Sequence, residues 1–186
     1  MMAKCTITAT PPPASASTLY KTIHHTCIEF LSSMSQDPSS PTLINTDDVR
    51  AVRTSDFEQT WGHRFSVSLH PQEYGTPLTM NGLVEHLEAA APLLKRWDVE
   101  IEDVVVDEVR RKAVVRSTYK MQAKGASLTT EEGENKKENE GEVEVKEVVE
   151  NDMVWMLQLD EAGERVEKAV EFKDYLADEK FKKTFD

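Results

Sequence analysis

The chain has 186 residues, of which 39% are hydrophobic, and this size suits a single domain that buries its own core. Its 34 acidic and 22 basic residues give a formal net charge of −12 and a pI near 4.9. We therefore expect no binding to nucleic acid or anionic membranes, because both are held mainly by lysine and arginine. The sequence has no run of about 18 apolar residues, so no transmembrane helix is expected.

Residues 1–18 predict a flexible tail, which leaves a single domain over 19–186. The tail is rich in Thr, Ser and Pro and lacks the apolar stretch of a secretory signal. The cysteines, Cys5 in this tail and Cys27 on a predicted helix, do not make a disulfide framework. The sequence therefore predicts a cytoplasmic protein with reduced thiols.

The acidic charge is concentrated in residues 127–147, where eight acidic side chains face three lysines. This stretch has no aromatic residue and only three aliphatic residues larger than alanine. It cannot bury enough apolar surface to offset the entropy of ordering it. We predict a disordered insertion between two strands at about 127–142; an acidic recognition segment is the alternative.

The first half of the domain has the pattern of helices. Apolar residues at three- and four-residue steps predict a helix over 19–35, which Ser17 or Thr18 can cap. Thr46 can cap a short second helix, and the two aspartates that follow suit its positive end.

The middle of the chain changes period twice. Alternation of apolar and polar residues predicts a strand over 61–69, and a turn follows over 70–77. Thr79 begins a third predicted helix, which Pro92 kinks or ends.

The remaining sequence has the pattern of strands joined by short turns. The predicted strands are 99–108, 112–123, 148–160 and 165–175. A short helix over 178–185 can cover one end of the domain. Short turns favour antiparallel neighbours, so the sequence predicts an α+β fold with N-terminal helices on one face of a curved antiparallel sheet.

Three stretches add detail to this order of elements. Residues 151–166, NDMVWMLQLDEAGERV, follow the pattern N-E-x-x-x-F-L-x-F-D-x-x-G-x-K-I, and EFKD at 171–174 follows E-F-x-D. RTSDF at 53–57 follows R-x-x-D-C. On these grounds the chain resembles the SnoaL-like branch of the nuclear-transport-factor-two-like superfamily. The resemblance implies a cone-shaped, cystatin-like α+β barrel, in which a bent sheet wraps a long helix and leaves a pocket at its open end.

The resemblance also implies a function class. It is strongest to small fungal proteins that act as cyclases or isomerases on polyketide or terpenoid intermediates. It implies acid–base chemistry without a cofactor, a hydrophobic small-molecule substrate and a homodimer formed through the outer sheet face. The sequence contains no HExxH, GxGxxG, GxxxxGK or CxxC motif, so no metal or nucleotide site is expected.

Candidate catalytic residues are acids, bases and oxyanion-binding groups near the expected pocket: Asp174, Asp152, His63, His70, Arg53 and Asp56. The strand period places Asp174 on an otherwise apolar face, which suits a general acid or base. The strand that carries Asp152 has two apolar faces, so its period does not tell which one lines the pocket. Either histidine can serve as a general acid or base, and the Arg–Asp pair can bind an oxyanion or tie down a loop.

Candidate substrate-binding residues are aromatic: Trp61, Phe65, Tyr74, Tyr119 and Trp155. Tyrosine hydroxyls can donate hydrogen bonds to a carbonyl that becomes an enolate, although these aromatic residues also suit a plain core. The leading hypothesis is a cofactor-free cyclase or isomerase. The alternative is a non-catalytic dimeric ligand-binding or scaffold protein. A cavity with convergent polar groups and perturbed pKa values would favour the enzyme.

Overall fold

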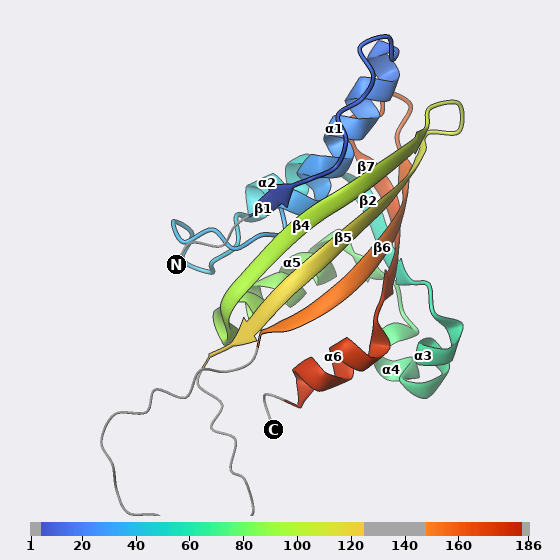
Figure 1. Cartoon of the computed structure of the whole chain (residues 1–186). Coiled ribbons are helices and arrows are strands. Elements are labelled where there is room, and N and C mark those ends of the chain that lie inside the picture. Colours follow the sequence, from blue (N-terminus) through green and yellow to red (C-terminus); the bar gives the residue numbers. More distant parts are fainter. Residues whose placement is uncertain (1–4, 125–147, 184–186) are drawn as a thin grey trace, which may run out of the picture.

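The computed structural model describes residues 5–124 and 148–183 (Figure 1). The helices are α1 (Thr18–Ser32), α2 (Thr46–Ala51), α3 (Arg64–Leu69), α4 (Pro71–Tyr74), α5 (Met80–Ala90), the 3₁₀ turn η1 (Ala91–Leu93) and α6 (Tyr175–Lys182). The strands are β1 (Cys5–Ile7), β2 (Arg53–Trp61), β3 (Leu78–Thr79), β4 (Leu94–Asp107), β5 (Lys112–Ala123), β6 (Val149–Leu159) and β7 (Val166–Lys173).

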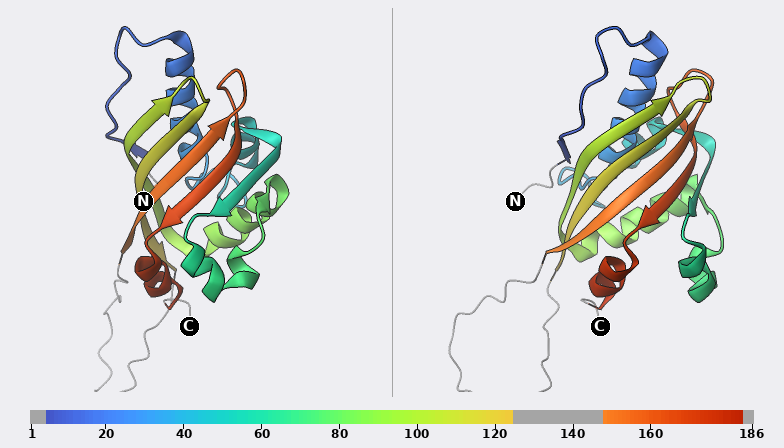
Figure 2. Two further views of the ribbon diagram at one scale, coloured as in Figure 1. Left: turned by 90° about the vertical axis from the view of Figure 1, so that its right-hand side faces the viewer. Right: turned by 45° about the vertical axis from the view of Figure 1, so that its right-hand side comes forward.

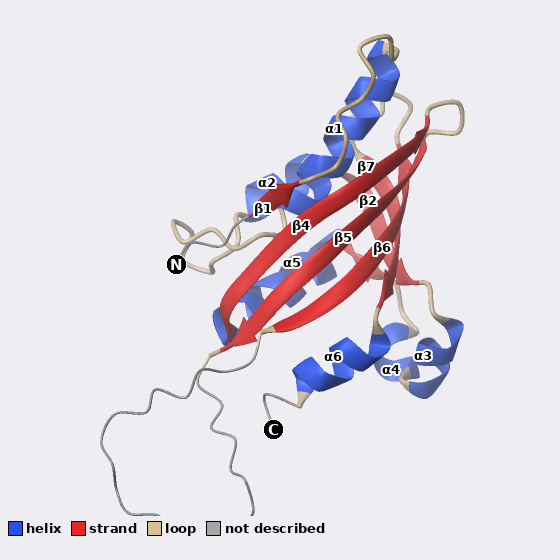
Figure 3. Cartoon of the chain, viewed as in Figure 1, coloured by secondary structure: helices blue, strands red, loops and turns tan. Residues whose placement is uncertain are grey.

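Within these residues, all strands join one curved sheet in the order β1-β4-β5-β6-β7-β2-β3. The meander β4–β7 is antiparallel, as predicted, whereas β1 pairs parallel with β4 and β2 pairs parallel with β7. Helices α1 and α5 lie on the same side of the sheet (Figure 2). Helix α6 lies at one end of the sheet, near α3 and α4 (Figure 3).

Helix α1 supplies one wall of the core. Ile23, Cys27, Phe30 and Leu31 are fully buried on its inner stripe, and burial of each large side chain contributes about 1.5–3 kcal/mol. The hydroxyl of Ser17 accepts a hydrogen bond from the backbone N–H of the third helical residue at 2.9 Å, as predicted for the cap. The α+β class and the N-terminal helical layer are therefore as predicted.

The predicted strand over 61–69 is wrong. The strand lies earlier, at Arg53–Trp61, and residues 64–69 form α3. The chain leaves the sheet at Gly62, where a Cβ atom would lie 2.2 Å from the ring of Phe172. Beyond this turn Leu69 is 50% exposed, so the short apolar alternation does not mark a buried strand face.

Other boundaries differ by a few residues. Asn45, and not Thr46, caps α2, because its side chain accepts hydrogen bonds from Asp47 and Asp48 N–H groups. Helix α5 begins at Met80, one residue after its predicted start, and Thr79 is its N-cap; Pro92 lies in the 3₁₀ turn that ends it.

The two ends of the chain also differ from the prediction. Residues 5–7 form β1 beside β4, although they belong to the predicted flexible tail. The C-terminal helix begins at Tyr175, three residues before its predicted start. The predicted disordered insertion at 127–142 lies outside the described residues.

Candidate functional site

A cavity of about 320 Å³ lies among the inner sheet face, α5 and α6. Its walls are mainly apolar and include Met34, Leu83, Leu87, Trp97, Met153 and Trp155. A smaller set of polar side chains also lines it, including Gln59, Tyr74, Tyr119, Asn151, Glu171 and Lys173. An apolar cavity with a few convergent polar groups is typical of a small-molecule site.

Glu171 is the central ionisable group of this cavity. It lies on β7 in register with Trp155 of β6, so it shares the inner sheet face with the core. Burial raises the pKa of its carboxyl from 4.5 to about 7, and this effect exceeds the opposing effects of Lys173 and of a hydrogen bond from Gln59. Glu171 is thus poised to take up or release a proton near neutral pH.

Three hydrogen-bond donors of residues that line the cavity are buried. The Tyr119 hydroxyl and the indole N–H groups of Trp97 and Trp155 have no hydrogen-bond partner within residues 5–124 and 148–183. Burial, followed by the charge of Glu171, raises the pKa of Tyr119 well above its ordinary value, so its phenol stays protonated. Since buried donors are nearly always paired, these groups indicate places for polar atoms of a ligand.

A charged cluster joins α6 to the cavity rim. Asp178 of α6 accepts a hydrogen bond from the Tyr74 hydroxyl at 2.9 Å and lies 3.0 Å from Lys173 Nζ and 3.3 Å from Lys182 Nζ. Burial raises the pKa of Asp178, but the two lysines and Tyr74 outweigh burial, and the net shift is downward. These contacts hold α6 over one side of the cavity.

Solved structures with the same architecture include BvnE pinacolase from Penicillium brevicompactum, with 17% identity, 92% of this chain and 97% of that chain covered, and a TM-score of 0.64. PrhC from Penicillium brasilianum is similar at 17% identity, with 90% of this chain and 89% of that chain covered and a TM-score of 0.64. A protein described as a SnoaL-like polyketide cyclase from Jannaschia sp. CCS1 is 14% identical over 90% of this chain and 95% of that chain, with a TM-score of 0.58.

The chain has the SnoaL-like fold. This confirms the resemblance drawn from the order of elements and the three short motifs. No family model and no curated protein sequence matches the chain. At 14–17% identity the likeness to the solved structures concerns the fold.

In this SnoaL-like cone, four of the predicted substrate-binding residues line the cavity: Trp61, Tyr74, Tyr119 and Trp155. The rings of Trp61 and Tyr74 lie 5.2 Å apart at their centroids, and Trp97 packs against Tyr119 at 6.3 Å. The remaining one, Phe65, falls in α3, and its side chain lies outside the described part of the structure.

None of the three predicted catalytic aspartates, Asp174, Asp152 and Asp56, is among the residues that line the cavity. Asp174 is exposed, and its carboxylate caps α6 by accepting hydrogen bonds from the N–H groups of Leu176 and Ala177. Asp152 is exposed on the outer face of β6, where it accepts a hydrogen bond from Thr118 at 2.8 Å. The sequence placed Asp174 on the strand face of Val170 and Phe172. In the structure this is the outer face of the cone, so it does not line the cavity.

The predicted histidines lie near α3 and α4. His63 is exposed and its ring packs edge-on against Phe172 at 5.4 Å. Nε2 of His70 lies 3.1 Å from the hydroxyl of Tyr175. Neither histidine is among the residues that line the cavity.

Arg53 and Asp56 both lie on β2, but Arg53 is buried and Asp56 is exposed. The guanidinium of Arg53 is buried, donates hydrogen bonds to Ser33 and to the backbone carbonyls of Val49 and Phe30, and lies 4.0 Å from the Phe30 ring centroid. Asp56 is exposed. Arg53 is therefore a structural residue of the core beneath the cavity wall.

Sequence reasoning missed Glu171 and Gln59 as site residues. Glu171 is the first residue of the EFKD stretch. Its neighbours Val170 and Phe172 are apolar, so the sequence predicted that their face of the strand, and not the face of Glu171, lines the cavity. The deciding signal is the register with β6, since Trp155 faces the core and pairs with Glu171. Gln59 is 4% exposed, and its Nε2 donates a hydrogen bond to Glu171 at 2.6 Å. The sequence carries no signal for it, because the residues around it do not alternate strongly between apolar and polar.

Among the described residues, no group of three or more His, Cys, Asp or Glu side chains is arranged to hold a metal ion.

Proposed function

We propose that this chain is a cofactor-independent cyclase or isomerase that uses Glu171 for acid–base chemistry on a hydrophobic polyketide or terpenoid intermediate. The observation that carries the proposal is a carboxyl with a pKa of about 7 inside an apolar cavity, beside buried donors that have no partner in the described structure. The structural neighbours named a pinacolase and a polyketide cyclase support an enzyme of this general kind.

The proposed chemistry begins with ionised Glu171. Its carboxylate removes a proton from the carbon next to a substrate carbonyl, and the electron pair of the C–H bond forms an enolate. The Tyr119 hydroxyl donates a hydrogen bond to the enolate oxygen. Protonated Glu171 then returns the proton to a different carbon, which is an isomerisation. Alternatively, the enolate carbon attacks a second carbonyl, the new alkoxide takes the proton, and a ring closes.

A direct test follows the proton. The full-length protein is incubated in D₂O with α-tetralone, a hydrophobic bicyclic ketone, and exchange of the hydrogens beside the carbonyl is followed by NMR. Wild type should accelerate exchange, and Glu171→Gln should lose about 10²–10⁴ of the acceleration, the usual contribution of a general base. Asp152→Asn, which changes an exposed carboxylate on the outer face, should keep it. Full acceleration in Glu171→Gln would overturn the role of Glu171.

The second candidate is a non-catalytic ligand-binding protein of the same fold. The observation that favours it is that Asp174 is solvent-exposed, while Trp, Met and Leu side chains form most of the cavity wall. Such a protein would bind apolar ketones, with a change in tryptophan fluorescence, but would not accelerate exchange. Binding with equal affinity by wild type and Glu171→Gln, without exchange in either, would support it.

The proposed substrate is a neutral, hydrophobic molecule that carries at least one carbonyl oxygen.

Over the described residues, no helix is long and apolar enough to cross a membrane. Cys5 and Cys27 are both free thiols, which supports the proposal of a reducing compartment such as the cytoplasm.

A further inference from the structure

The two oxygens of the Glu171 carboxyl have different surroundings. Oε2 accepts a hydrogen bond from Nε2 of Gln59 at 2.6 Å. Oε1 accepts no hydrogen bond within residues 5–124 and 148–183, and it is not one of the side-chain atoms that are buried there without a partner. Oε2 is therefore occupied, and Oε1 is the oxygen that stays accessible to a molecule in the cavity.

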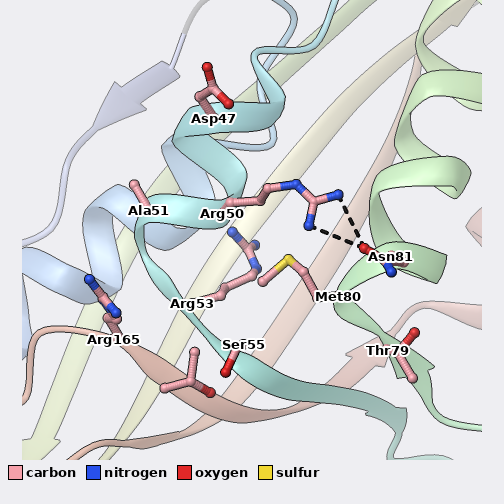
Figure 4. Close-up of a pocket in the computed structure, with 10 residues that line it drawn as sticks. Asp47, Arg50, Ala51, Arg53, Ser55, Thr79, Met80, Asn81 and Arg165 are labelled. Atoms are coloured by element: carbon pink, nitrogen blue, oxygen red, sulfur yellow. Dashed lines mark hydrogen bonds between the residues drawn. The ribbon is translucent and has the colours of Figure 1, made fainter.

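The strand that carries Gln59 is braced on both sides. The backbone of Gln59 pairs with Ala169 of β7 on one side and with Leu78 of β3 on the other. Strand β3 continues directly into α5, and Figure 4 shows Arg50 of α2 reaching across to Asn81 at the start of this helix, with Nη1 and Nη2 each 3.2 Å from Asn81 Oδ1. A buried amide on such a strand keeps a fixed place in the cavity wall.

A purely structural role does not explain the amide group of Gln59. The backbones of β2 and β7 already join these strands in a parallel ladder. The carbonyl oxygen of the Gln59 side chain is buried without a hydrogen-bond partner in the described structure, which is unfavourable. An apolar side chain of similar size would fill the same space without this cost, so the contribution that only the amide makes is its contact with Glu171.

We propose that Gln59 positions the Glu171 carboxyl for the proton transfer of the proposed function, on which this role rests, so that Oε1 is the oxygen that exchanges the proton with the substrate. A neutral carboxyl has one O–H and one C=O oxygen, and the C=O oxygen is the better acceptor for an amide N–H. While the amide holds Oε2, the proton removed from the substrate carbon bonds to Oε1, and the electron pair of the C–H bond stays on the substrate. In the return step the Oε1–H bond breaks, and its electron pair stays on the carboxylate.

The charged groups of the cavity leave Gln59 as the direct partner of this carboxyl. Lys173 and Asp178 lie 3.0 Å apart and act on Glu171 with opposite signs. Within the described residues, neither of them forms a hydrogen bond or an ion pair with Glu171. The other titratable side chains that line the cavity are Tyr74 on α4, His86 on α5, Tyr119 on β5 and Lys182 on α6. A change at Gln59 removes the hydrogen bond and leaves all these groups in place.

The first measurement is a titration of the carboxyl without substrate. The full-length protein is labelled with ¹³C-glutamate, and the carboxyl signal of Glu171 is identified by its absence from the NMR spectrum of Glu171→Gln. Gln59→Met keeps the size of the side chain but removes the N–H that favours the ionised carboxylate, so the titration midpoint should rise by about one pH unit. Gln59→Asn, whose amide is one methylene too short for the contact, is the second variant and should shift the midpoint in the same direction.

The second measurement is the exchange of α-tetralone in D₂O as a function of pH. The pH midpoint of the Gln59→Met rate should rise by the same amount as its NMR midpoint. The plateau rate at high pH should fall about tenfold or more, because the carboxyl is ionised there in both proteins and only its orientation is lost. The ketone concentration for half-saturation should change less than about threefold, since Gln59 acts through Glu171.

Thr60→Val is the matched control. It replaces the next residue of β2, which points to the other face of the sheet, and both midpoints and the plateau should stay as in wild type. Unchanged NMR midpoints in both Gln59 variants, or a wild-type plateau in Gln59→Met, would overturn the role of Gln59. If wild type does not exchange α-tetralone, the proposed function fails, and the NMR midpoints alone decide whether Gln59 controls this carboxyl.

Discussion

Gln59 Nε2 donates a hydrogen bond to Glu171 Oε2 across 2.6 Å, and this contact joins the neighbouring parallel strands β2 and β7 inside the cavity. The hydrogen bond favours the ionised carboxylate, whereas burial favours the neutral acid. Burial is the larger effect, so the pKa of Glu171 rises to about 7 and its proton is retained at a pH where ordinary glutamates have lost theirs.

This balance predicts a pH-dependent stability difference. Between pH 4.5 and about 7 the folded protein holds a proton on Glu171 that the unfolded chain releases. The stabilisation is therefore complete below pH 4.5 and is lost as the pH rises through 7, by up to about 3 kcal/mol. Glu171→Gln stays neutral, so urea unfolding should show it more stable than wild type at pH 8, with the gap shrinking toward pH 4.5.

The matched control is Glu150→Gln, which changes an exposed glutamate on β6. Its stability difference from wild type should show no comparable rise over the same pH range. If the stability difference between Glu171→Gln and wild type did not change with pH, Glu171 would have the same pKa in the folded and unfolded states, and its proposed role as a near-neutral base would be wrong.

Local patterns predicted the elements in which both the period and the boundaries are clear. Residues 112–123 form β5 with the predicted bounds, because Ala113, Val115, Ser117, Tyr119 and Met121 recur at every second position and mostly polar residues lie between them. The strand over 61–69 failed because a few alternating residues do not distinguish a strand from a short exposed helix. The strand ends at the turn that contains Gly62, and this turn packs against the ring of Phe172, which is distant in sequence.

The candidate site was predicted in part. Tyr119 was predicted from the alternation of its strand, which places it on the same face as Val115 and Met121. Trp155 was named as a large aromatic residue, although the period of its strand does not tell which face lines the pocket. Glu171 was missed because Val170 and Phe172 cover the outer face, so both sides of β7 carry apolar residues. Only the register between β6 and β7 shows which side faces the cavity, and register is a tertiary property.

The buried guanidinium of Arg53 predicts a sharp distinction between arginine and lysine. Its fork donates to Ser33, Val49 and Phe30, and one lysine ammonium cannot reproduce this planar set. Arg53→Lys should lower the free energy of unfolding by about 2–4 kcal/mol, since carbonyls and a charge remain buried and unmatched. Arg116→Lys, on the outer face, should change it by less than about 0.5 kcal/mol. Equal effects in urea denaturation would contradict a structural role for Arg53.

Two glycines should respond in opposite directions to alanine. Gly163 has a φ of +73°, and an added Cβ would lie 2.7 Å from Ile23 Cγ1. Gly163→Ala should therefore destabilise the protein by about 1–3 kcal/mol. Gly82 lies in α5, where the nearest atom would be 3.5 Å away, so Gly82→Ala should stabilise by about 0.5–1 kcal/mol. Thermal unfolding measures both; a stabilised Gly163→Ala variant would contradict the close packing of this turn on α1.

The outer face of the sheet carries a row of exposed apolar side chains. Val105, Val114 and Met156 are neighbours on β4, β5 and β6, and they are 57%, 39% and 48% exposed. We propose that two copies of the chain associate through this row, because a contiguous apolar patch is more stable when covered. Light scattering should show a dimer for wild type and a monomer for Val114→Lys. Val109→Lys, which changes an exposed valine in the β4–β5 turn outside the row, should remain dimeric; a monomeric wild type, or dissociation of both variants, would rule out this interface.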